Sequence, residues 1–98
     1  MDIILIKQLT NPIFEKFGVS RASLFGSVVR GDIHEKSDVD ILVELPKKLR
    51  GLDFVGMKMD LQEELEKKLK KKVDLVEYHL IKKSLKKYIL PEQKPIYP

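Results

Sequence analysis

The sequence predicts an α/β (α+β) fold, in which a small mixed three-stranded sheet is packed by helices. Three short segments with apolar residues, each of a length suited to a strand, lie at residues 19–25, 38–45 and 73–78. Three longer segments repeat apolar residues every three or four positions, as amphipathic helices do, at residues 3–17, 52–71 and 80–90. Because the two kinds of segment alternate along the chain, we expect a sheet layer covered by helices.

The first predicted helix contains a proline, and the sequence leaves two interpretations open. The apolar positions of this helix end at Gly18, which suits a left-handed helix cap. Pro12 either kinks one continuous helix or begins a second helix capped by Thr10 or Asn11, because proline is tolerated in a first helical turn.

The first predicted strand runs directly into a turn signal. Residues 19–25 are stopped by Gly26-Ser27, after which we expect a short helical turn over 27–30 and an exposed loop over 31–37. The second strand, 38–45, has an apolar centre and ends at Pro46, as a strand covered on both faces would.

The predicted domain covers residues 1–90. The long helix at 52–71 carries one apolar stripe, which is more typical of a core contact than of a partner groove. Residues 91–98 hold three prolines, and we expect them to form an irregular tail or a short edge segment.

Composition limits the class of protein. The 98 residues suit one domain, and 43% hydrophobic with 35% charged residues excludes an intrinsically disordered chain. The absence of Cys excludes a disulfide framework and a thiolate zinc site, and it favours a cytoplasmic setting. The apolar run at residues 3–6 is too short for a signal sequence or a membrane span.

The net charge of +4 arises from lysines late in the chain, around residues 67–72 and 82–87. A basic surface can attract nucleic acid. Glu63 and Lys67, however, are four residues apart, and this spacing recurs along the helix as on an ordinary solvated helix face. We therefore do not expect nucleic acid to be the partner.

Two carboxylates in Asp38-x-Asp40 suggest a cation site. On a strand, residues two apart point to the same face, about 7 Å apart along the backbone. Crowding two like charges costs free energy unless a cation neutralises them, and oxygen-only ligands suit Mg²⁺. Two such ions can stabilise both oxygens of an in-line phosphoryl displacement. Alternatively, the motif simply begins a strand in solvent.

The element just before these acids favours the cation site. Gly26 permits close approach of backbone to a ligand, and Ser27 at a helix start offers a hydroxyl and an amide to phosphate oxygens. Arg30, one turn later, has a guanidinium that suits the same phosphates. Its alternative role is a surface ion pair with Asp32 or Glu35.

A third acid, Asp74, interrupts the apolar segment at 73–76. An unpaired carboxylate within an apolar strand is costly in free energy, so a charged residue at this position requires a partner or a function. If the third strand lies beside the second, Asp74 completes a set of three carboxylates and can help to deprotonate an acceptor hydroxyl. The alternative is an edge-strand residue that faces solvent.

Together, Gly26-Ser27, the pair Asp38-x-Asp40 after ten intervening residues, and Asp74 on a later strand resemble the DNA polymerase beta nucleotidyltransferase superfamily. The strings LFGSVVRG at 24–31 and SDVDILV at 37–43 are most similar to the minimal nucleotidyltransferases, which are antitoxin partners of HEPN-domain toxins. The resemblance extends to about residue 90 and implies a polymerase beta-like nucleotidyltransferase fold.

The resemblance also implies an activity. AMP would pass from ATP to a hydroxyl, namely a tyrosine of a HEPN toxin that is thereby silenced, with two Mg²⁺ ions as cofactors. It assigns two groups of site residues: the catalytic metal ligands Asp38, Asp40 and Asp74, and the phosphate-binding Gly26, Ser27 and Arg30.

The acceptor is expected to lie outside this chain, because the nucleotide half takes up nearly all of its 98 residues. A partner protein, an RNA or a second copy would each provide an acceptor, and only the resemblance favours the toxin. One alternative is a non-catalytic, nucleotide-binding antitoxin that neutralises its partner by complex formation. Another is a transferase that acts on RNA and uses the lysine-rich helix to bind it.

Overall fold

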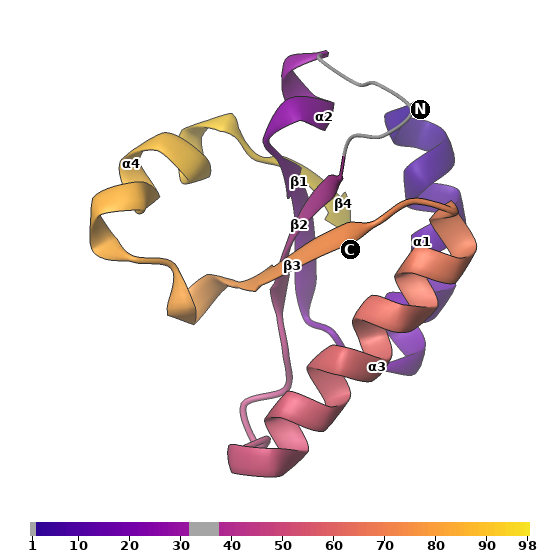
Figure 1. Ribbon diagram of the computed structural model, residues 1–98, viewed down its shortest axis with the longest axis vertical. Coiled ribbons are helices and arrows are strands. Elements are labelled where there is room, and N and C mark those ends of the chain that lie inside the picture. Colours follow the sequence, from indigo (N-terminus) through magenta and orange to yellow (C-terminus); the bar gives the residue numbers. More distant parts are fainter. Residues whose placement is uncertain (1, 32–37) are drawn as a thin grey trace.

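The computed structural model describes residues 2–31 and 38–98. Its elements, in chain order, are α1 (Ile3–Lys16), β1 (Arg21–Phe25), α2 (Ser27–Arg30), β2 (Val39–Glu44), α3 (Gly51–Leu69), β3 (Val73–Glu77), the 3₁₀ turn η1 (Tyr78–Leu80), α4 (Lys83–Glu92) and β4 (Lys94–Tyr97). The predicted α/β architecture with a mixed sheet is confirmed (Figure 1). The loop expected over 31–37 lies, from position 32 onward, outside the described residues.

The sheet has the strand order β3-β2-β1-β4. Strand β1 runs antiparallel to both β2 and β4, whereas β2 and β3 are parallel. A parallel pair needs a crossover connection, and α3 with its 19 residues provides it. The crossover brings the second and third predicted strands side by side.

Helix α1 is continuous through Pro12, so the first of the two interpretations is correct. The Asp2 side chain caps the helix by accepting a hydrogen bond from the Ile4 amide at 3.1 Å. Inside the helix, the buried Thr10 hydroxyl donates to the Ile6 carbonyl at 2.7 Å, which satisfies its own polar group locally.

One face of the sheet is covered by α1 and α3, which lie side by side (Figure 1). Every second residue of β2 points into this layer, and the two helices contribute apolar side chains that are fully buried. The largest members of this core are Phe14, Ile6, Leu24, Ile41, Leu61, Leu65 and Ile96. Burying each such side chain contributes about 1.5–3 kcal/mol, so this layer dominates the stability of the fold.

The other face of the sheet is covered lightly. A small cluster of Leu42, Tyr78 and Ile81 packs there, and α4 lies on this side with no residue that is buried. The Tyr78 hydroxyl is hydrogen-bonded to Ser23 Oγ at 2.7 Å and to Gln93 Oε1 at 2.6 Å. Tyr78 thus connects β1 to the residue that directly follows α4.

The C-terminal segment differs from the predicted irregular tail and gives the sheet four strands instead of three. Residues Lys94–Tyr97 form β4, which pairs with β1 and is an edge strand of the sheet formed by the described residues. Pro95 is compatible with this edge position, because an edge strand has an outward side that needs no donor. The alternative of a short edge segment agrees with the structure, and the buried Ile96 makes the segment part of the core.

In the described part of the chain, no helix is long and apolar enough to cross a membrane.

Candidate functional site

Strand register brings the predicted site together at one end of the sheet. Phe25, the last residue of β1, pairs with Asp40 on β2, and Asp40 pairs with Asp74 on β3. Neighbouring strands are about 4.8 Å apart and paired residues share a face, so the two aspartates are close neighbours. Gly26 follows Phe25 directly and therefore lies next to the Asp40 carboxylate.

Gly26 is required at its position for two reasons. Its backbone has φ +74° and ψ −147°, a conformation that other residues rarely adopt. A Cβ atom at this position would also collide with the Asp40 carboxylate. The chain then enters α2, where the Val29 and Arg30 amides donate to the Gly26 carbonyl at 3.1 and 3.2 Å.

The three acids differ in exposure. Asp38 and Asp74 are exposed, whereas Asp40 is half-buried between them and the Gly26 turn. The pKa of Asp40 is raised from 3.8 to about 6, first by burial and then by the neighbouring Asp74 and Asp38 carboxylates. Arg30 acts in the opposite direction. Asp40 is thus a carboxylate whose charge needs compensation.

This set of donors fits a hard divalent cation. It consists of carboxylate oxygens alone, which Mg²⁺ prefers, and a bound cation would relieve the repulsion that raises the pKa of Asp40. Among the described residues, no three acidic or histidine side chains stand close enough to hold a metal ion as they are. Mg²⁺ does not require three protein ligands, because it commonly binds one or two carboxylates and completes its coordination shell with water and substrate oxygens.

A fourth acid, Glu92 at the end of α4, also reaches the site. Its Oε1 accepts a hydrogen bond from the Gly26 amide at 2.7 Å and from Arg30 Nη1 at 3.0 Å. Glu92 also raises the pKa of Asp40. The sequence does not indicate this residue, since it lies 66 positions after Gly26 and no motif accompanies it.

The structure places Arg30 beside the Gly26 turn, as the sequence predicts. Its guanidinium forms an ion pair with Glu92 at 3.0 Å. The alternative partners considered for Arg30, Asp32 and Glu35, lie outside the described residues. Ser27 begins α2 and is partly exposed, so its hydroxyl can meet a ligand.

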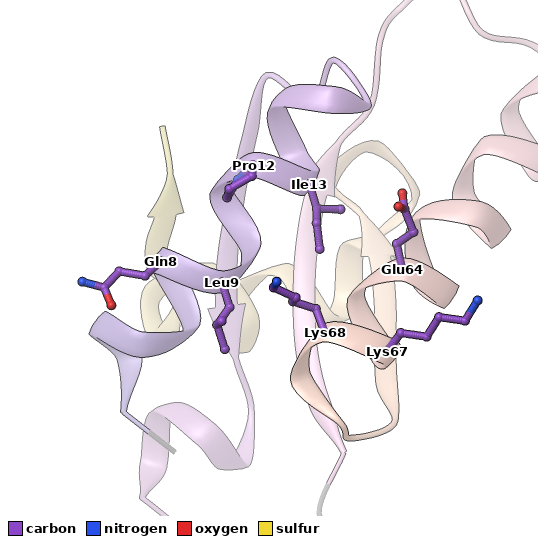
Figure 2. Close-up of a pocket in the computed structure, with 7 residues that line it drawn as sticks. All are labelled: Gln8, Leu9, Pro12, Ile13, Glu64, Lys67 and Lys68. Atoms are coloured by element: carbon purple, nitrogen blue, oxygen red, sulfur yellow. The ribbon is translucent and has the colours of Figure 1, made fainter.

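A groove of about 450 Å³ lies elsewhere, between α1 and α3 (Figure 2). Its lining residues are Gln8, Leu9, Pro12, Ile13, Glu64, Lys67 and Lys68. None of the predicted site residues lines this groove, so its shape has no direct bearing on the acids. The candidate site is instead an open sheet end, formed by the turn after β1 and by two parallel strands.

With this geometry established, comparison with known proteins identifies the family. Residues 7–98 match the family described as "Polymerase beta, Nucleotidyltransferase". The chain therefore belongs to the polymerase beta nucleotidyltransferase family, as its motifs suggested.

Two relatives give the family a more specific context. The chain is 46% identical over 92 residues to MJ0435 of Methanocaldococcus jannaschii, a candidate protein adenylyltransferase, covering 94% of this chain and 95% of that protein. It is 42% identical over 78 residues to the protein adenylyltransferase MntA of Thermococcus cleftensis, covering 80% and 75% of the two chains.

Solved structures share the fold. A toxin–antitoxin complex with AMP-PNP matches with a TM-score of 0.76 at 22% identity, covering 93% of this chain and 72% of that chain. A tri-AMPylated Shewanella oneidensis HEPN toxin in complex with MNT antitoxin matches with a TM-score of 0.71 at 19% identity, covering 98% and 72%. A protein described as a candidate minimal nucleotidyltransferase matches with a TM-score of 0.69 at 28% identity, covering 97% and 96%.

Proposed function

We propose that this protein is an antitoxin that transfers AMP from ATP to a tyrosine hydroxyl of a partner HEPN-domain toxin. The main observation behind the proposal is the strand register of Phe25, Asp40 and Asp74. This register brings a turn suited to phosphate binding and acidic side chains together at one end of the sheet. Support for the choice of reaction comes from the relatives named protein adenylyltransferases. Support for the choice of partner comes from the solved toxin–antitoxin complex with an AMPylated toxin.

In this proposal, the turn after β1 binds the nucleotide phosphates. The Gly26 amide, the Ser27 hydroxyl and the Arg30 guanidinium are the donors, and Arg30 adds a positive charge. The lack of a side chain at Gly26 lets a phosphate oxygen approach the backbone amide.

Asp38, Asp40 and Asp74 would hold Mg²⁺ on the same side of the sheet. When bound, the cation supplies positive charge to the phosphate oxygens on which negative charge develops during the reaction. Asp40, as the half-buried member, would be the anchoring ligand, because it gains most from a neutralising charge.

The transfer itself follows from these positions. The acceptor hydroxyl oxygen forms a bond to the α-phosphorus, the bond from that phosphorus to the β-phosphate bridging oxygen breaks, and pyrophosphate leaves. The hydroxyl proton passes to a base, a role that we assign to Asp74. This carboxylate is exposed on the edge strand β3, so a partner's hydroxyl can reach it.

The test uses the purified protein, Mg²⁺ and the candidate toxin. ATP labelled at the α-phosphate should transfer its label to the toxin, and ATP labelled at the γ-phosphate should not. An Asp38→Ala, Asp40→Ala double variant should reduce transfer to background, whereas Asp60→Ala, an exposed acid on α3, should leave it unchanged. Equal labelling by both forms of ATP would contradict adenylyl transfer.

The same double variant decides between this proposal and the non-catalytic alternative. If the variant still binds the toxin and protects cells as well as the wild type does, neutralisation occurs by complex formation alone. If protection is lost while binding persists, neutralisation depends on the transfer.

A further inference from the structure

The carboxylate of Glu92 occupies the position that the proposed function gives to a phosphate. Its Oε1 accepts from the Gly26 amide at 2.7 Å and from Arg30 Nη1 at 3.0 Å. These are two of the three groups to which we assign phosphate binding. A carboxylate and a phosphate oxygen make the same kind of charge-assisted hydrogen bond to such donors.

The two anions compete for these donors. The single Gly26 N–H is already directed at Glu92, and Arg30 is engaged by the same oxygen. A phosphate placed beside Glu92 would also meet a like charge in a region that already contains Asp38, Asp40 and Asp74. Nucleotide binding therefore requires Glu92 to leave.

The structure around Glu92 permits such a movement. Helix α4, which ends at Glu92, has no buried residue, so little packing holds it in place. The next residue, Gln93, is hydrogen-bonded to Tyr78 at 2.6 Å, and Ile96 in β4 is fully buried. Glu92 thus lies where a weakly held helix meets a firmly held strand.

We propose that Glu92 is a built-in competitor for the nucleotide phosphates, which closes the phosphate-binding turn until the end of α4 moves away. This inference rests on the proposed function, since it concerns the same turn. It assigns a regulatory role to a residue outside the family motifs. The apparent affinity for nucleotide is then the intrinsic affinity reduced by the fraction of molecules in which the turn is open.

The experiment measures binding of two probes, AMP-PNP with Mg²⁺ and inorganic pyrophosphate, by calorimetry. In Glu92→Ala, the Kd for both should fall by about fivefold, because the competing carboxylate is gone. If Glu92 instead serves to hold the Gly26 turn and Arg30 in place, the same variant should bind both probes more weakly, and the inference is wrong.

Two further variants separate contact from charge. Glu92→Asp keeps the charge but is one methylene shorter, so this variant should also bind both probes more tightly than the wild type. If Glu92→Asp binds with wild-type affinity while Glu92→Ala binds more tightly, the negative charge acts from a distance and not by direct contact, and the proposed competition is wrong. Glu63→Ala removes one exposed carboxylate from α3 and should change neither Kd. If the wild type and Glu92→Ala both fail to bind either probe, the phosphate site itself is refuted, together with this inference.

Discussion

Gly26 and Asp40 depend on each other, because the carboxylate occupies the space that any side chain at position 26 would need. Two residues that are 14 positions apart in the sequence therefore constrain one another through the pairing of β1 with β2. This mutual constraint explains why a glycine stands directly before Ser27, where the backbone also needs a positive φ.

Gly26→Ala should consequently be more damaging than an equivalent change at Gly31. Both glycines have positive φ, at 74° and 79°, but a Cβ at Gly31 meets no atom of the described residues within 4 Å. We expect Gly31→Ala to cost about 1 kcal/mol of unfolding free energy, from backbone strain alone. Gly26→Ala should cost about 3 kcal/mol and lower adenylyl transfer by roughly 100-fold. Urea unfolding and label transfer measure both, and equal effects of the two variants would contradict the collision with Asp40.

The raised pKa of Asp40 has a consequence for stability. The folded protein holds this proton more tightly than the unfolded chain does, because the pKa rises from 3.8 to about 6. The carboxyl therefore contributes stability below about pH 4 and loses that contribution as the pH rises through about 6. Without divalent cations, Asp40→Asn should be about 1 kcal/mol more stable than the wild type at about pH 7.5, an advantage that disappears at about pH 4.

Urea unfolding at these two pH values tests the sign, and Asp60→Asn on α3 controls for the loss of one exposed charge. Mg²⁺ should then reverse the order, because it stabilises only a site that retains its carboxylate. A wild type that is unaffected by Mg²⁺ would argue against a cation at Asp40.

At the scale of elements, β4 shows where sequence patterns fail. The strands at 38–45 and 73–78 were predictable because each is a short segment rich in apolar residues, and β2 and β3 lie within those limits. Strand β4 has one apolar anchor, Ile96, beside Pro95, and its stability depends on pairing with β1. That pairing is a tertiary contact, and a local sequence pattern contains no information about it.

The same reasoning applies to the site. The turn at Gly26-Ser27, the acids Asp38 and Asp40, and the neighbouring Asp74 follow from local motifs and from one parallel pairing. Glu92 depends on how α4 turns back toward β1, which no spacing in the sequence expresses.

Ile96 provides the test of whether β4 is an integral part of the fold. Its side chain is fully buried, so Ile96→Ala should lower the free energy of unfolding by about 3 kcal/mol through lost burial and a residual cavity. The matched control is Ile4→Ala in α1, where the side chain is 65% exposed and the cost should stay within about 0.5 kcal/mol. Chemical denaturation compares the two, and similar costs would mean that β4 adds little to the core.

At the scale of the whole molecule, the two faces of the sheet are unequal. One face carries a broad core beneath α1 and α3, while the other holds a small cluster beneath α4. The proposed catalytic groups lie at the sheet end on the lightly covered side, where the structure can change with least disturbance to the core.

Hydrogen exchange should show the difference in local stability between the central strands and the lightly packed helix α4. Amides in the central strands β1 and β2 should exchange slowest, because opening them requires global unfolding. Amides in α4 should exchange at least about tenfold faster, since no residue of that helix is buried. Mass spectrometry of peptides from the two regions provides the measurement, and α4 protection equal to that of β2 would contradict a mobile helix.

The hydrogen bonds of Tyr78 to Ser23 and Gln93 limit how slowly Glu92 can leave the Gly26 turn. They fix the chain immediately after Glu92 to the strand that leads into Gly26, so Glu92 can depart only as a side chain and a helix end. Motions of that size take nanoseconds to microseconds, far less than an ordinary catalytic turnover. Release of the turn should therefore appear in rapid-mixing experiments as a single binding phase of reduced apparent affinity, with no separate slow step before it.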